Sequence, residues 1–276
     1  MKQNKTVAFV QHCIVYIMAA IFLAPFLLSI LLSLKSKQET TKSVLALPES
    51  IHWENFTMAV EKANIFNSIK NSLVVTVCSV LIVILVSAMA GYGIARQYKK
   101  RSFRLYETVL LASMMIPFQT LMIPIYKMYK GLGLLNTLAG VIIIISGMNM
   151  AFAIIMYIGF VRTLPVELEE AALLEGCGRF KMFFKIVFPL LKPITTTIAV
   201  LNALWVWNEF NASLLILQKN AVKTIPIQQF VFFGEHSANY NMAFAAAVIT
   251  MIPIVLFFIL AQKHIVEGMV NGAVKG

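Results

Sequence analysis

Apolar runs long enough to cross a bilayer recur along the whole sequence. A helix that crosses the hydrocarbon core needs about 20 such residues. The chain is 59% hydrophobic and 13% charged, too poor in polar residues to cover a soluble domain of 276 residues. We therefore predict an all-α polytopic membrane protein, formed by one transmembrane domain with six spanning helices. The predicted spans are 7–34, 68–95, 105–126, 137–160, 190–217 and 242–261.

Basic residues indicate which side of the membrane each loop faces. The net charge is +11, and the strongest basic run directly follows the second predicted span. Cytoplasmic loops carry an excess of Lys and Arg, so we place this loop, the loop 162–189 and both termini in the cytoplasm. Nucleic-acid binding is a poor explanation, because the run is short and lies between two spans. The run consists of Arg96, Lys99, Lys100, Arg101 and Arg104.

The loop 162–189, here called the central loop, has the pattern of two short helices joined by a glycine turn. Pro165 suits the first position of a helix, and three Glu residues follow where the helix dipole favours carboxylates. Gly176 and Gly178 offer a stop and a turn. We expect the first helix to expose Ala171, Ala172 and Leu174, which suggests that another protein docks there. The alternative is an ordinary amphipathic helix lying on the bilayer.

The central loop resembles the signature loop of ABC importer permeases, whose pattern is E-A-A, three residues, G, nine residues, then I-x-L-P. Phe188 replaces the usual Leu, a conservative departure. The resemblance implies a type I permease fold, and a loop helix that docks into a cleft on a cytoplasmic ATPase. The positions in register are Glu170, Ala171, Ala172, Gly176, Ile186 and Pro189.

Two further stretches are similar to the carbohydrate-importer branch of that family. They are the WNEF sequence of the fifth span and the tail 262–276, which resembles the end of the maltose-type second permease. In that relative the tail reaches the ATPase dimer, whereas composition alone would indicate a frayed terminus. The resemblance implies ATPase contacts by Gly272, Val274, Lys275 and Gly276.

Side chains able to bind a sugar gather in the fifth span, around the carboxylate of Glu209. An ionised group there should face the bundle interior or water. On a continuous helix, Trp205, Asn208 and Glu209 would share a face. We expect Pro117 and Pro124 to break the third span, and Gln119 between them is a further candidate, because interrupted helices often line a transport pathway. Hydrogen bonding between helices remains the alternative for all of them, and in the maltose branch the partner permease holds most sugar contacts. The candidates are Asn202, Trp205, Asn208, Glu209, Asn211 and Gln119.

The sequence shows no recognisable motif for catalysis, nucleotide binding or zinc binding. It has no GxxxxGK[ST] phosphate loop, zinc helix motif or serine elbow, so we expect no catalytic residue, metal or cofactor. The resemblance implies a carbohydrate importer subunit in a bacterial inner membrane, with ATP and Mg bound by a partner ATPase dimer. It also implies a second permease forming a heterodimer, an extracytoplasmic sugar-binding protein and surrounding lipid.

Three other functions remain open. Within the same family, the cargo could be glycerol phosphate or an acidic sugar, but we find no Lys or Arg near the centre of any span. An ion-driven secondary carrier would need titratable groups that the spans lack. A membrane-embedded enzyme would need more catalytic groups than Glu209 alone.

Overall fold

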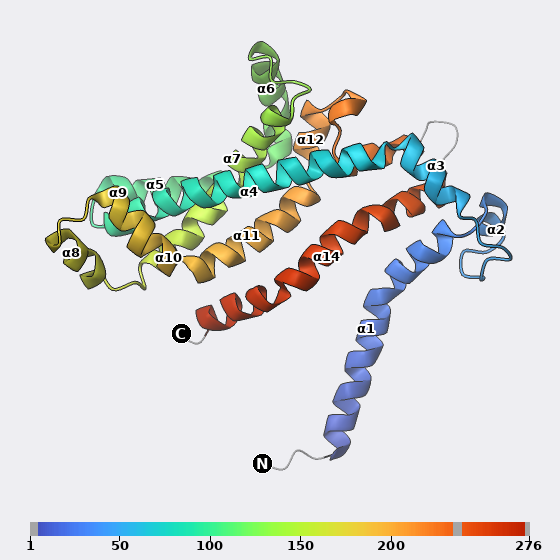
Figure 1. Ribbon diagram of the computed structural model, residues 1–276, viewed down its shortest axis with the longest axis horizontal. Helices are drawn as coiled ribbons and strands as arrows, with labels where there is room; N and C mark the ends of the chain where they lie inside the picture. Colours follow the sequence, from blue (N-terminus) through green and yellow to red (C-terminus); the bar gives the residue numbers. More distant parts are fainter. Residues whose placement is uncertain (1–4, 234–238, 274–276) are drawn as a thin grey trace. The chain divides into compact units, whose positions relative to one another are not determined.

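The computed structural model describes the backbone of residues 5–233 and 239–273, and the side chains of residues 9–233 and 239–262. All the elements described are helices, as predicted from the long apolar runs (Figure 1). The longest are α1 (Lys5–Ser33), α4 (Ile65–Arg96), α7 (Leu138–Val161) and α14 (Tyr240–Ala273). The others are α2 (Lys37–Lys42), α3 (Glu54–Lys62), α5 (Arg101–Ser113), α6 (Phe118–Gly131), α8 (Glu167–Leu174), α9 (Arg179–Met182), the π-helix η1 (Phe183–Val187), α10 (Phe188–Leu190), α11 (Lys192–Trp207), α12 (Asn211–Ile216), η2 (Asn220–Val222), α13 (Ile225–Gln228) and η3 (Gln229–Phe232).

Four helices of the described chain, α1, α4, α7 and α14, are long and apolar enough to cross a membrane. Up to six crossings result if each of two bent pairs is one span. One pair is α5 with α6, bent by 100°, and the other is the segment Arg179–Leu190 with α11, bent by 75°. The described chain therefore has four to six candidate spans.

Proline explains only one of the predicted interruptions in the third span. The backbone leaves the helix between Ser113 and Phe118, just before and at Pro117. Proline lacks an N–H and restricts the residue before it, which favours a break there. Pro124 lies inside α6, so the second predicted break is wrong.

The chain divides into two compact units, of which the larger comprises residues 67–227 and 253–276. Within it, α4, α7, η1 and α11 contribute to one apolar core that includes Ile94, Tyr157, Phe183 and Ile198. A second core lies toward the other end of α7, where α6, α11 and α12 meet it. The first core places the second half of the central loop directly on α4 and α7.

Gly91 allows α4 and α7 to approach each other closely. A Cβ atom at Gly91 would lie 2.6 Å from Cβ of Tyr157 and 3.1 Å from the carbonyl oxygen of Ile154. Small residues at helix crossings let two backbones pack together in this way. Tyr157 is fully buried at this crossing, and its hydroxyl donates to Oγ1 of Thr195, 3.0 Å away.

The smaller unit, residues 1–66 and 228–252, is shaped by polar side chains bound to backbone carbonyls. Lys35 is fully buried, and its Nζ donates to the carbonyls of Ser43 and Ala46, each at 2.7 Å. Nδ2 of Asn241 donates to the carbonyl of Leu32 at 2.8 Å. These bonds satisfy groups that burial would otherwise leave unpaired at a cost of about 1–3 kcal/mol each.

Candidate functional site

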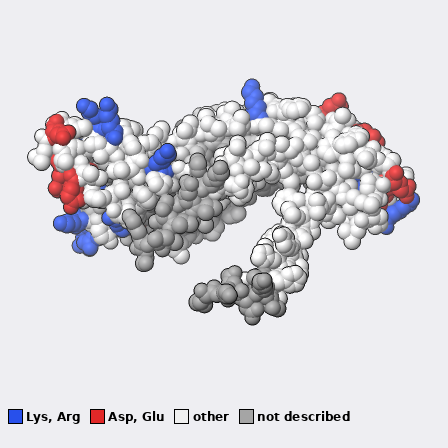
Figure 2. All heavy atoms as spheres, turned by 60° about the horizontal axis from the view of Figure 1, so that its bottom comes forward, with Lys and Arg blue, Asp and Glu red and all other residues white. Residues whose placement is uncertain are grey.

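The central loop forms two short helices joined by a turn, as the sequence predicted. The first is α8, and the second begins as α9 and continues through η1 into α10. Pro165 precedes α8 instead of occupying its first position, because the helix begins at Glu167 after the cap residue Val166. In Figure 2, acidic and basic side chains gather over the part of the larger unit where Figure 1 places α8 and α9.

Gly176 forms the turn that ends α8. Its φ is +78°, a left-handed conformation that side chains with a Cβ rarely adopt. The amide of Gly176 donates to the carbonyl of Leu173, and the amide of Cys177 donates to that of Ala172, both at 3.0 Å. This pair of bonds is the Schellman motif, which satisfies the free carbonyls at a helix end. Glycine at this position is therefore a requirement of the backbone.

The residues in register with the permease signature do not all face outward. Glu170 and Ala171 of α8 are exposed, but Ala172 is buried, with 5% of its surface accessible. The expectation that Ala172 is presented for docking is therefore wrong, because α8 turns that side toward the rest of the loop. Ile186 is half-buried in η1, and Pro189 is exposed in α10.

Large apolar side chains on α8 and α9 are exposed to an unusual degree. Leu174 is 90% exposed and Phe180 is 73% exposed, and both Leu168 and Leu173 also face outward. Exposed large apolar groups near charged ones are typical of surfaces that bind a protein or a membrane. The four side chains Leu168, Leu173, Leu174 and Phe180 are here called the exposed apolar residues of the loop.

A charged network that sequence reasoning missed holds α8 to the end of α4. Oε1 of Glu169 accepts from Nε of Arg96 at 2.8 Å and lies 2.7 Å from its Nη2. Oε2 of Glu169 accepts from the hydroxyl of Tyr92 at 2.7 Å. The Glu169 and Arg96 side chains are only 10% and 17% exposed. The one signal in the sequence is a second Glu next to Glu170, which alone does not reveal a partner on α4.

The π-helix η1 packs against the same part of α4. The ring centroids of Phe183 and Tyr92 are 5.5 Å apart, and Phe183 is buried. A π-helix is rare and is frequently found at functional sites. Tyr92 therefore contacts both halves of the central loop, α8 through its hydroxyl and η1 through its ring.

The candidate sugar-binding residues of the fifth span do not share one helical face. α11 ends at Trp207 and α12 begins at Asn211, so Glu209 lies in the break between them. Its carboxylate accepts from the amides of Ala212 at 2.7 Å and Ser213 at 2.9 Å, at the beginning of α12. The predicted face formed by Trp205, Asn208 and Glu209 is therefore wrong, since it required an unbroken helix.

The other candidates differ in how accessible they are. Asn202 is fully buried, and its Nδ2 donates to the carbonyl of Ile198 within α11. Trp205 is 46% exposed and packs edge-to-face on Phe152, with centroids 4.9 Å apart. The remaining three, Asn208, Asn211 and Gln119, are exposed.

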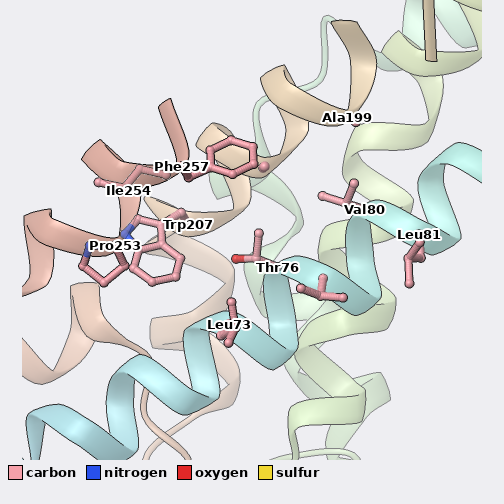
Figure 3. Close-up of a pocket in the computed structure, with 11 residues that line it drawn as sticks. Leu73, Thr76, Val80, Leu81, Ala199, Trp207, Pro253, Ile254 and Phe257 are labelled. Atoms are coloured by element: carbon pink, nitrogen blue, oxygen red, sulfur yellow. The ribbon is translucent and has the colours of Figure 1, made fainter. Parts of the chain in front are cut away.

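A pocket of about 260 Å³ lies between α4, α11 and the part of α14 after residue 252 (Figure 3). Its lining is almost entirely apolar and includes Leu73, Trp207 and Phe257, with Thr76 as the one hydroxyl. A sugar site needs several hydrogen-bonding groups besides an aromatic face. This pocket is therefore unsuited to a carbohydrate.

Other predicted sites are placed only in part. Gly272 lies near the end of α14, and Val274, Lys275 and Gly276 lie outside the described residues. Within the described part of the chain, no group of three or more His, Cys, Asp or Glu side chains is placed to hold a metal ion.

Comparison with known proteins identifies the family. A model described as the inner membrane component of binding-protein-dependent transport systems matches residues 83–271, which include the central loop. The melibiose/raffinose/stachyose import permease protein MelC of Bacillus subtilis is 37% identical over 261 residues, covering 94% of each chain. The multiple sugar-binding transport system permease protein MsmG of Streptococcus mutans is 33% identical over 277 residues, covering 99% of each.

A solved structure supports the fold independently. A chain of a bacterial ABC transporter involved in the import of the acidic polysaccharide alginate superposes with a TM-score of 0.79. The two chains are 22% identical, and the match covers 95% of this chain and 98% of that one. The chain belongs to the family of binding-protein-dependent transport system inner membrane components.

Proposed function

We propose that this chain is the permease subunit of an ATP-driven importer for a neutral oligosaccharide, with six spans and both termini in the cytoplasm. Membership of the permease family and the similarity to MelC and MsmG support this proposal. The central loop supports it most strongly, because a glycine-terminated helix presents exposed apolar residues near charged ones, as a site for a protein or a membrane does. The match of the loop to the permease signature favours the protein partner.

The proposed complex contains a second permease, an ATPase dimer and an extracytoplasmic sugar-binding protein. The ATPase dimer binds ATP and Mg and hydrolyses the ATP, and its cleft receives α8. In this scheme Glu170 and Ala171 face the cleft, Gly176 sets the angle between α8 and α9, and the tail from Gly272 onward adds a further ATPase contact. Ala172 is buried within the loop, Ile186 is half-buried in η1, and Pro189 lies in α10, which leads the loop into the fifth span.

Alternating access supplies the mechanism. Closure of the ATPase dimer on ATP moves α8, and the packed core of α4, α7, η1 and α11 passes this motion to the spans. Because interiors are packed closely, a displacement at the loop is transmitted along the helices instead of being absorbed locally. The pathway then opens toward the binding protein, which delivers the sugar.

The sugar pathway involves residues that are exposed on this chain. We assign Trp205, Asn208 and Asn211 to it, with Gln119 on α6, because their side chains are exposed to a sugar or to the second permease. Asn202 is buried and bonded within α11, and Glu209, in the break after α11, is bonded to amides at the beginning of α12, so we assign both to the wall of the pathway.

Neutral cargo is favoured over glycerol phosphate or an acidic sugar. The four straight spans comprise the stretches Phe9–Ser33, Ile65–Arg96, Leu138–Val161 and Tyr240–Gln262. Of these, only Ile65–Arg96 contains Lys or Arg, and Lys70 and Arg96 lie near its ends. An anionic cargo would need positive charge closer to the centre. A secondary carrier would need a relay of titratable groups in the spans, and the four straight spans contain no Asp or Glu.

Purification of the complex and a panel of saccharides test this proposal. We expect the chain to copurify with a second permease and an ATPase, and neutral oligosaccharides with their binding protein to stimulate ATP hydrolysis. Stimulation only by glycerol phosphate or uronic-acid sugars would reject the neutral cargo. Failure to copurify with any ATPase would reject the importer itself.

A further inference from the structure

We propose that Arg96 and Tyr92 are positioning residues for coupling: with Glu169, they fasten α8 to α4, so that a displacement of α8 moves α4. This set of three residues is here called the α4–α8 latch. The inference rests on the proposed function, because it assigns to α4 the motion that a partner ATPase imposes on α8.

The geometry of the latch requires arginine. Two nitrogens of one guanidinium face the same carboxylate oxygen of Glu169, at 2.7 and 2.8 Å. Nη2 also donates to the carbonyl of Leu164 at 3.1 Å, which fixes the chain just before α8. A planar group with several fixed donors can make these bonds together, whereas lysine offers one point charge.

Burial makes the latch stiffer than an exposed ion pair. The Glu169 and Arg96 side chains are 10% and 17% exposed, so little water competes for their bonds. The hydroxyl of Tyr92 donates to the second carboxylate oxygen of Glu169, at 2.7 Å. Exposed salt bridges contribute little because solvent screens them, but removal of one partner from a buried pair leaves the other uncompensated.

The neighbouring crossing of α4 and α7 makes α4 suitable as a lever. Gly91, one residue before Tyr92, brings the two backbones together at Tyr157. A tight crossing next to a fixed attachment allows α4 to tilt about one point, and prevents α8 from sliding along it. Phe183 rests on the ring of Tyr92 at 5.5 Å and keeps the second half of the loop on the same helix.

α8 itself offers a matched control. Glu167 and Glu170 are exposed, whereas Glu169 is the one acidic residue of α8 that is buried. Substitution of Glu167 changes the charge of the same helix by the same amount without touching the latch. Glu170 is unsuitable as a control because it is assigned to the ATPase cleft.

The test compares ATP hydrolysed per sugar imported, with the complete complex in lipid vesicles. We expect Glu169→Gln and Arg96→Gln to raise this ratio about fivefold or more, the range that a typical coupling free energy carries. Glu167→Gln should leave the ratio unchanged. Exchange of the pair, Arg96→Glu with Glu169→Arg, should restore part of the coupling, which a loss of folding would not allow.

The outcomes separate the latch from the function on which it rests. If the wild-type complex imports no sugar with ATP, the proposed function fails. If it does, and Glu169→Gln and Arg96→Gln both assemble and couple like wild type, the latch alone is rejected. Should these variants not assemble, Tyr92→Phe, which removes one hydroxyl, decides: a raised ratio supports the latch, and an unchanged ratio rejects it.

Discussion

At the scale of the residue, glycine at position 176 is the clearest case in which the backbone dictates the side chain. Its φ of +78° follows from the Schellman turn that ends α8. The spacing of the motif predicted a glycine turn, and the turn is confirmed. The structure adds that Gly178, two residues later, has a φ of −65° and does not need glycine.

We predict that Gly176→Ala weakens the central loop by about 1 kcal/mol, the cost of a left-handed conformation for a residue with a Cβ. Limited proteolysis of the purified complex should then cut between α8 and α9 faster, and sugar uptake should fall. Gly178→Ala is the matched control, because space around it is open and its φ is ordinary. Equal proteolysis of the two variants would contradict the role given to the turn.

Whether the surroundings of a residue could be predicted depended on how far away in the sequence its partners lie. Glu170, Gly176 and Pro189 belong to one local pattern, so the sequence predicts the loop that holds them. Arg96 and Glu169 lie 73 positions apart and meet only because α4 and α7 pack together. Glu209 was misplaced for another reason: helical periodicity assumes an unbroken helix, and α11 ends two residues before it.

At the scale of the element, the crossing of α4 and α7 depends on one missing side chain. We predict that Gly91→Ala destabilises the protein by about 1–3 kcal/mol, because a Cβ atom would lie 2.6 Å from that of Tyr157. Thermal unfolding of the detergent-purified chain should show the loss. Gly93→Ala, with open space around the glycine, should unfold like wild type. A Gly91→Ala variant as stable as Gly93→Ala would contradict the tight crossing.

The short helix α2 has a capping box that depends on pH. Oε2 of Glu39 accepts from the amide of Ser36 and Oε1 accepts from that of Glu49, both at 2.6 Å. These bonds lower the pKa of Glu39 from 4.5 to about 2, and the bond from the amide of Ser36 has the largest effect. Since the folded pKa is depressed, the carboxylate stabilises the fold fully above about pH 4.5, and this stabilisation is lost as the pH falls toward 2.

Hydrogen exchange at the amides of Ser36 and Glu49 measures this effect. We expect Glu39→Gln to lower their protection at pH 6, and the difference from wild type to shrink between pH 4.5 and 2. Glu61→Gln, on the exposed side of α3, should change neither amide. A difference from wild type that stayed constant down to pH 2 would contradict the depressed pKa.

At the scale of the whole molecule, composition predicted a helical membrane protein, and the described chain is helical with four to six candidate spans. The number of spans was less predictable, because two of the apolar runs form pairs of helices that are bent by 100° and 75°. A hydropathy pattern reports where apolar residues lie in the sequence and contains no information about such bends. The side of the membrane on which each loop lies remains a prediction from the Lys and Arg distribution.

Labelling of single cysteines tests this topology. In a chain whose three native cysteines are replaced by serine, Leu174→Cys should react only with a reagent that enters the cytoplasm. Leu47→Cys, in the loop between α2 and α3, should react from outside. Both leucines are highly exposed, 90% and 81%, so in the chain expressed without its ATPase access depends only on the side of the membrane. Labelling of Leu174→Cys from outside would overturn the docking of α8 on an ATPase.

The central claim is that this chain transports only when a separate ATPase drives it, and uptake by reconstituted vesicles tests it most directly. The account predicts that vesicles with both permeases, the ATPase and the binding protein accumulate oligosaccharide when ATP is supplied on the ATPase side. It predicts no accumulation by vesicles that contain this chain alone. Accumulation by this chain alone, without nucleotide, would contradict the account.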